Sequence, residues 1–211
     1  MNGGGSSTYN NALKAVEMFD EECPGHTLRV RVLDSHTYSM PYGWYFCECA
    51  RKVRNGGELN ACVDELLRKL YCVEICLAAY SLRQMKKSGR VSAAAAVVGD
   101  LLGIRPIISL NDGVSKVESK VRGDAAVPVA MVKWVQGRVD NVKDMPYMVA
   151  YTSSTAKRDE LVKLCRKTFG HAPMFVFQLG GVVSANTGPD AIAIVFEGHP
   201  RHLEAYTPSL P

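Results

Sequence analysis

Residues 105–121, RPIISLNDGVSKVESKV, carry the clearest folding signal in the sequence. Arg105–Leu110 and Val114–Val121 have the composition of strands, and Asn111-Asp112-Gly113 separates them. An Asp-Gly pair between two such runs is a strong hairpin signal, because the turn needs residues that tolerate positive φ. The stretch therefore predicts two antiparallel strands joined by a tight turn.

Helical and strand patterns alternate on both sides of this hairpin. Apolar residues three and four apart indicate helices, and short β-branched runs indicate strands. Before the hairpin we expect one helix that begins at Tyr9, two more at Pro41–Val53 and Leu59–Leu70, and strands at Leu28–Leu33 and Tyr71–Leu77. We also expect a short basic helix that begins at Leu82 and ends at Gly89, followed by an Ala/Val-rich helix at Val91–Leu102. After it we expect helices at Ala125–Val139 and Ala156–Phe169, strands at Tyr147–Thr152, Pro173–Gln178 and Ala191–Phe196, and a glycine-rich loop at Leu179–Pro189. This order predicts an α/β protein built from βαβ-type units with a mostly parallel sheet.

Length and composition limit the class of protein. With 211 residues, 47% hydrophobic and 22% charged, the chain is long enough for one large or two small globular domains. A net charge of +4 without a dense basic stripe argues against nucleic acid as the partner. No apolar run is long enough to span a membrane, and the first residues lack the pattern of a secretory signal.

The seven cysteines predict reduced structural thiols rather than disulfides or a metal site. Their number is odd, and neither Cys47-x-Cys49 nor Cys72-x3-Cys76 has the paired partner or the nearby histidine of a zinc site. Cys72 and Cys76 lie in an apolar run, where cysteine acts as a small hydrophobe. We expect a reducing, cytoplasmic environment and no cofactor.

Three polar segments are candidates for chemistry. Ser6-Ser7-Thr8 places hydroxyls at a helix start, where they either cap the helix or bind an anionic or carboxyl group. Lys120 and Arg122 share one strand face and either bind phosphate or protect an exposed edge. Ser184–Pro189 either approaches a ligand or is a plain turn. GxSxG, P-loop, GxGxxG and HExxH motifs are absent from the sequence.

Six segments in order along the chain resemble motifs of the DegV family of bacterial fatty-acid-binding proteins. They are Ser6–Ala12 (family S-G-T-Y-x-x-A, with Ser7 for glycine), Val32–Ser35 (V-x-D-S), Lys86–Ser92 (K-K-G-G-R-I-S), Leu101–Ile108 (L-L-N-I-K-P-I-L), Lys120–Gly123 (K-V-R-G, after the D-G turn) and Gly181–Pro189 (G-x-V-I-G-x-H-x-G-P).

The resemblance implies a two-domain DegV-like fold. We expect a truncated parallel-sheet N-terminal α/β domain at residues 1–82 and a C-terminal α/β domain with a mixed sheet at residues 83–211. The chain is described as truncated because family members carry a further βα portion before the S-G-T loop. The function implied is to bind one long-chain fatty acid between the domains and present its carboxyl group to a fatty acid kinase, without catalysing the transfer.

The resemblance also implies roles for individual residues. Ser6, Ser7, Asn186 and Arg122 would hold the carboxyl head group, and Lys120 and Arg90 would contact the kinase or a phosphate. Asn186 stands where the family has histidine, so it can form hydrogen bonds but cannot carry a proton at neutral pH. Two rival functions remain open: a phosphotransferase or hydrolase that uses Ser6 or Ser7 as nucleophile, and an inactive fragment of a DegV protein.

Overall fold

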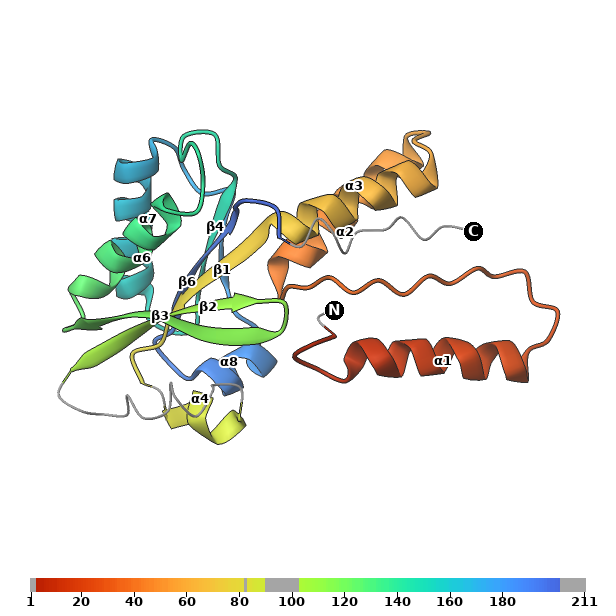
Figure 1. The fold of residues 1–211 in the computed structure, drawn as a ribbon, viewed down its shortest axis with the longest axis horizontal. Helices are drawn as coiled ribbons and strands as arrows, with labels where there is room; N and C mark the ends of the chain where they lie inside the picture. The colour runs from red at the N-terminus through yellow and green to blue at the C-terminus, as the bar shows by residue number, and fades with distance from the viewer. Residues whose placement is uncertain (1–2, 82, 90–102, 202–211) are drawn as a thin grey trace. The chain divides into compact units, whose positions relative to one another are not determined.

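The computed structural model describes residues 3–81, 83–89 and 103–201. The chain divides into two compact units (Figure 1). The first unit contains Met1–Tyr71 together with Asp112–Val114, and the second contains Cys72–Asn111 and Ser115–Pro211. The predicted domain boundary between residues 82 and 83 stays a prediction.

The first unit consists of helices and loops. Its helices are α1 (Thr8–Glu22), α2 (Met40–Arg54) and α3 (Leu59–Cys72), in agreement with the predicted helices. Two contacts hold α2 against α3: Lys52 Nζ lies 2.6 Å from Glu65 Oε1, and Lys69 Nζ lies 5.4 Å from the centre of the Tyr45 ring. Apolar residues of both helices are buried, among them Tyr45, Leu66 and Leu70.

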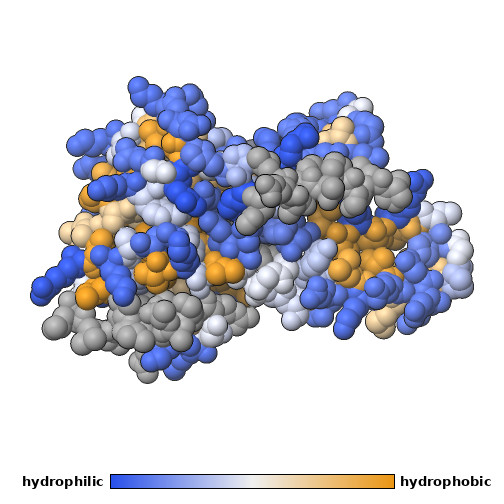
Figure 2. All heavy atoms as spheres, viewed as in Figure 1, coloured by the Kyte–Doolittle hydropathy of each residue, from blue (hydrophilic) through white to orange (hydrophobic). Residues whose placement is uncertain are grey.

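The predicted strand at Leu28–Leu33 is wrong. The segment is extended, but it pairs with no strand among the described residues. Leu28 and Val30 are 60% and 48% exposed, and Figure 2 shows an apolar patch over this segment and α1. A strand needs a neighbour for its backbone N–H and C=O groups, and the described part of the first unit supplies none.

The second unit contains one six-stranded sheet in the order β3-β2-β1-β6-β4-β5. Its strands are β1 (Val73–Ala78), β2 (Ile104–Asn111), β3 (Val114–Arg122), β4 (Tyr147–Tyr151), β5 (Phe175–Gln178) and β6 (Ile192–Glu197). The hairpin of β2 and β3 is confirmed, with φ of 51° at Asp112 and 82° at Gly113.

The α/β class with a mixed sheet is confirmed, whereas the expected mostly parallel arrangement is wrong. Strand β1 runs antiparallel to both β2 and β6, and β6 runs antiparallel to β4. Parallel pairing is seen between β4 and β5. The helix α7 (Thr155–Phe169) joins these two strands, as a parallel crossover requires.

Helices α6 (Ala126–Gln136) and α7 pack on the sheet and complete the core of the second unit (Figure 1). Strands β1, β4 and β6 are almost wholly buried. At the centre, the rings of Tyr147 and Phe169 meet edge to face at 5.1 Å, and the Tyr147 hydroxyl donates to the His171 carbonyl at 2.9 Å. Helix α7 begins at the cap Ser154, whose hydroxyl accepts from the Lys157 N–H, and ends at Gly170 with φ 85°.

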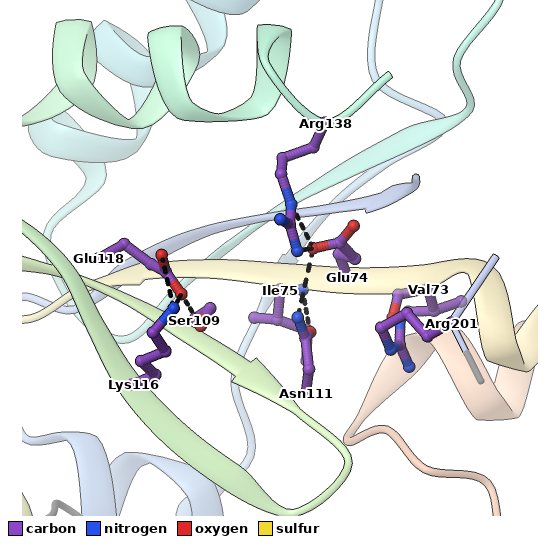
Figure 3. A network of polar contacts seen from close by, with 9 residues as sticks. All are labelled: Val73, Glu74, Ile75, Ser109, Asn111, Lys116, Glu118, Arg138 and Arg201. Carbon is purple, nitrogen blue, oxygen red and sulfur yellow. Dashed lines mark hydrogen bonds and ion pairs between the residues drawn. The ribbon is translucent and has the colours of Figure 1, made fainter. Parts of the chain in front are cut away.

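A buried acid is held at the start of β1 (Figure 3). Glu74 is 2% exposed, and its Oε2 accepts hydrogen bonds from Arg138 Nε at 3.0 Å and Arg138 Nη2 at 2.8 Å. Asn111 Nδ2 donates to the same oxygen at 3.2 Å. The backbone of Gly198 packs against the other oxygen of this carboxylate, because a Cβ at residue 198 would lie only 2.6 Å from Glu74 Oε1. The charge of the carboxylate is therefore compensated by the Arg138 guanidinium, which donates two hydrogen bonds to one oxygen, and by the Asn111 amide.

A second acid in Figure 3 lies on β3. Glu118 Oε1 accepts a hydrogen bond from the Ser109 hydroxyl at 2.8 Å, and Lys116 lies beside it. Burial acts to raise the pKa of Glu118, but the Ser109 hydrogen bond and Lys116 outweigh it, so the pKa is lowered. This contact fixes β3 to the neighbouring strand β2.

The glycine-rich segment 179–189 was predicted as a loop, and this is wrong for its centre. Residues Gly181–Thr187 form the short helix α8. Side chains within the helix bond back to it: Asn186 Nδ2 donates to Val182 O at 2.7 Å, and Thr187 Oγ1 donates to Val183 O at 3.1 Å. These bonds allow residues that usually favour turns to remain helical.

Other predictions have mixed outcomes. The short basic helix is present as α4 (Arg83–Ser88), ending before Gly89 with φ 68°. The predicted helix at 91–102 lies outside the described residues. All seven cysteines are free thiols, and burial raises the pKa of Cys165 to about 12. No helix in the described part of the chain is long and apolar enough to cross a membrane.

Candidate functional site

A glycine loop leads into α1 in the first unit. The Gly3 N–H donates to both carboxylate oxygens of Asp34, at 3.1 and 3.0 Å. A Cβ on Gly3 would lie 2.4 Å from Asp34 Oδ2, and one on Gly5 would lie 1.8 Å from the Tyr38 hydroxyl. The close approach of this backbone to Asp34 and Tyr38 explains why the loop is made of glycines.

The hydroxyls after this loop have different partners. Ser7 occupies the N-cap of α1, but its side chain makes no capping hydrogen bond. The Ser6 hydroxyl accepts from the Thr8 N–H at 3.3 Å and lies 2.8 Å from Thr8 Oγ1. Ser6 is half-buried and Ser7 is exposed. The contacts of Ser6 therefore fix a hydroxyl at the helix start.

No base activates these hydroxyls in the described part of the chain. The Ser6 side chain contacts Thr8, and no histidine, lysine or carboxylate is hydrogen-bonded to Ser6 or Ser7 among the described residues. A serine nucleophile needs such a base within hydrogen-bond reach. The described residues therefore give no support to a Ser6 or Ser7 nucleophile.

The segment 34–38 connects the glycine loop to two other parts of the first unit. The Asp112 N–H donates to the His36 carbonyl at 3.3 Å, and His36 Nδ1 lies 3.7 Å from Asp112 Oδ1. The His36 ring stacks on Tyr71 at 4.9 Å, with its Nε2 lying 3.3 Å from the Tyr71 hydroxyl. The backbone of Gly4 packs closely on Gly113. A Cβ on Gly113 would lie 2.5 Å from the Gly4 carbonyl carbon. Segments distant in sequence thus converge around the glycine loop.

Sequence reasoning assigned no role to His36, Thr37, Tyr71 or Asp112. Thr37 is 1% exposed, and its hydroxyl has no hydrogen-bond partner among the described residues. The Asp112-Gly113 pair indicates only a turn, and nothing in the local pattern places Asp112 beside residue 36. These contacts join residues 35 or more positions apart, which periodicity cannot show.

A groove of about 730 Å³ lies in the second unit, at the carboxyl ends of the parallel strands β4 and β5. Gln178 Nε2 donates to the Thr152 carbonyl at 2.7 Å across these strand ends. The lining is made of small, hydroxyl, amide and apolar residues: Thr152, Ser153, Gln178, Leu179, Gly180, Gly181, Ser184, Ala185, Gly188 and Pro189. A lining without charged side chains suits an uncharged or apolar part of a ligand.

The other predicted site residues lie in the second unit or outside the described residues. Asn186 lies on α8, one position beyond the groove-lining Ala185, with its amide bonded to its own helix. Lys120 and Arg122 are both exposed on β3, as strand alternation predicts. Arg90 lies outside the described residues. Ser6, Ser7, Asn186 and Arg122 stay predictions for the head group, and Lys120 and Arg90 for the kinase or phosphate contact.

The comparison with protein families gives one match over nearly the whole chain. A family model described as "Uncharacterised protein, DegV family" matches residues 1–199. The chain belongs to the DegV family. The resemblance on the six motifs is thereby confirmed, and the DegV match includes both the glycine loop and the α8 segment.

Relatives with the DegV domain are distant in sequence. A DegV domain-containing protein of Corynebacterium glutamicum is 27% identical over 192 residues, covering 90% of this chain and 67% of the relative. One from Clostridium perfringens is 24% identical over 200 residues, covering 92% of this chain and 66% of the relative. The chain thus spans about two thirds of the length of these relatives.

Solved DegV structures share the fold. A DegV family protein from Eubacterium eligens loaded with heptadecanoic acid has a TM-score of 0.81 at 21% identity, covering 94% of this chain and 71% of its own. The stearic acid-binding protein from Eubacterium ventriosum has a TM-score of 0.78 at 20% identity, covering 92% of this chain and 67% of its own. The DegV family protein from Corynebacterium glutamicum has a TM-score of 0.81 at 24% identity, and the match covers 95% of this chain and 74% of that protein.

Proposed function

We propose that this DegV protein binds a long-chain fatty acid and holds its carboxyl group with the hydroxyl of Ser6. The observation that carries the proposal is the Ser6 hydroxyl, fixed at the start of α1 by the N–H and hydroxyl of Thr8. The likeness to proteins loaded with heptadecanoic acid or described as stearic acid-binding supports the ligand class.

The physical chemistry of such a ligand suits this chain. Each buried CH2 of an acyl tail contributes about 0.8 kcal/mol, so a long chain has ample gross driving force for binding. The head group is the costly part, because a carboxyl group removed from water needs hydrogen bonds. A serine hydroxyl can donate to the carboxylate or accept from the protonated acid, so it serves either state.

Removal of the Ser6 hydroxyl tests the head-group role. We expect Ser6→Ala to weaken binding of palmitate or oleate by about 10- to 150-fold, which is the loss of one hydrogen bond to a charged group. Displacement of a fluorescent fatty acid measures the affinity, and mass spectrometry of lipid extracted from purified protein identifies the natural ligand. Ser119→Ala, at an exposed position of β3, is the matched control. A folded wild-type protein that binds no fatty acid would refute the proposed function.

We further propose that the loaded protein presents the carboxyl group to a fatty acid kinase and does not itself catalyse the phosphorylation. The exposed cations Lys120 and Arg122 on β3 support a contact with an acidic kinase surface or with the transferred phosphate.

Charge reversal tests the kinase contact. With Lys120→Glu and Arg122→Glu together, we expect acyl phosphate formation by a bacterial fatty acid kinase to fall about tenfold or more when the protein is saturated with fatty acid. The measurement is the initial rate of ATP-dependent acyl phosphate production at subsaturating binding protein. Lys163→Glu together with Lys167→Glu, at two exposed positions on α7, makes the same change in net charge and is the control. An unchanged rate in the Lys120→Glu, Arg122→Glu variant would contradict the proposed contact.

A further inference from the structure

Asp34 is the residue against which the glycine loop is built. Its carboxylate accepts the Gly3 N–H with both oxygens, at 3.1 and 3.0 Å, and the His36 N–H with Oδ1 at 2.9 Å. It forms no ion pair with a lysine, arginine or histidine among the described residues. Its acceptor capacity is therefore directed at backbone donors of two segments, which are 31 and 2 residues away in sequence.

The fit between Gly3 and Asp34 leaves no room for a side chain. A Cβ on Gly3 would meet Asp34 Oδ2 at 2.4 Å and the Tyr9 ring at 3.1 Å. Three consecutive glycines have more backbone freedom to lose on ordering than any other sequence of that length. The loop therefore needs an anchor, and the Asp34 carboxylate is the anchor at its beginning.

The other end of the loop is fixed by the first turn of α1. Ser6 follows the glycines, and the hydrogen bonds of its hydroxyl to Thr8 attach it to the helix. With Gly3 bound to Asp34, the backbone leading to Ser6 is held at both ends. Loss of the Asp34 attachment removes one of the contacts that fix the backbone leading to Ser6.

We propose that Asp34 is the positioning residue for the head-group hydroxyl of Ser6, and that it contributes to the preference for a carboxyl head group without touching the ligand. This inference rests on the proposed fatty acid binding. A residue that acts in this way affects recognition of the acid group and leaves the grip on the acyl tail unchanged. A residue that only stabilises the fold would weaken binding of every ligand alike.

The experiment compares two ligands of the same chain length, palmitic acid and methyl palmitate, on Asp34→Asn. The amide replaces one acceptor oxygen by an NH2 group, so the Gly3 N–H loses one of its two acceptors and meets a donor in its place. We expect affinity for the acid to fall about 5- to 10-fold and affinity for the ester to change less than twofold. Asp140→Asn, at a side chain that is 96% exposed, should alter neither.

Gly3→Ala tests the same contact from its other side. The added methyl group fits only if the Asp34 carboxylate moves away from Gly3, so this variant should show the same loss of acid-over-ester preference. The double variant should be no worse than either single one, because each breaks the same contact. If Asp34→Asn shows no cooperative unfolding transition, Gly3→Ala decides the question alone.

The outcomes separate this inference from the proposed function. If the wild-type protein binds palmitic acid and both variants keep its acid-to-ester affinity ratio, Asp34 is not a positioning residue and the inference is overturned. An equal loss for acid and ester in both variants also overturns it. If the folded wild-type protein binds neither ligand, the proposed function itself fails.

Discussion

Replacing Phe169 with alanine will lower the free energy of unfolding by about 3–5 kcal/mol, the usual cost of removing a fully buried aromatic ring. Phe169 is the last residue of α7 and has no exposed surface. Its ring meets Tyr147 on β4 edge to face, so the variant loses both buried area and an aromatic contact. The cavity left behind is enclosed by a helix and a sheet, which limits its collapse.

Urea denaturation followed by circular dichroism measures this change. Val182→Ala is the control for loss of apolar side-chain atoms, because Val182 is 81% exposed, and its effect should stay within about 0.5 kcal/mol. A Phe169→Ala protein that loses less than about 1 kcal/mol would show that this part of the core is not packed as described.

Replacing Arg138 with alanine will have a comparable effect, about 3–5 kcal/mol, because it leaves the buried Glu74 carboxylate without its cation. Arg138 supplies two of the three side-chain hydrogen bonds that Glu74 Oε2 accepts, and Asn111 supplies the third. Arg138 is itself 43% exposed, so the cost comes from the acid that stays behind rather than from burying the arginine.

Glu74→Gln in the Arg138→Ala background tests whether the uncompensated charge of Glu74 causes the loss of stability. A neutral amide needs no cation, so the double variant should recover a large part of the stability that Arg138→Ala lost. Arg51→Ala is the control, since Arg51 is 54% exposed and its guanidinium lies over Trp44 on the same helix. A double variant as unstable as Arg138→Ala alone would mean that charge compensation is not the reason for the loss.

Local signals predicted the local elements well. The β2–β3 hairpin follows from Asp112 and Gly113, two residues that tolerate the positive φ of the turn. Sheet topology could not be predicted in this way. Strand β1 lies between β2 and β6, and its register with β6 pairs Cys76 with Ile194, more than a hundred residues away. The same alternation of strands and helices along the chain is compatible with a parallel sheet and with this mixed sheet. It therefore does not determine the directions of the strands.

The candidate site was likewise predicted only where a local sequence signal exists. The hydroxyls of Ser6 and Ser7 follow from a helix start, and Ser6 proved to have the structural contacts there. The contact of Asp34 with Gly3 could not be predicted, because it depends on the path of the chain between them. Helix α8 was missed because Asn186 and Thr187 usually favour turns, and only the structure shows that they bond back to the helix.

The extended segment at Leu28–Leu33, which joins no sheet among the described residues, has a consequence for the behaviour of the protein in solution. Exposed backbone donors and acceptors next to Leu28 and Val30 form a template on which another chain could add a strand. Arg29 and Arg31 alternate with these apolar residues and are exposed. Two copies aligned along this segment would bring four guanidinium groups together, and the resulting repulsion protects the protein against aggregation.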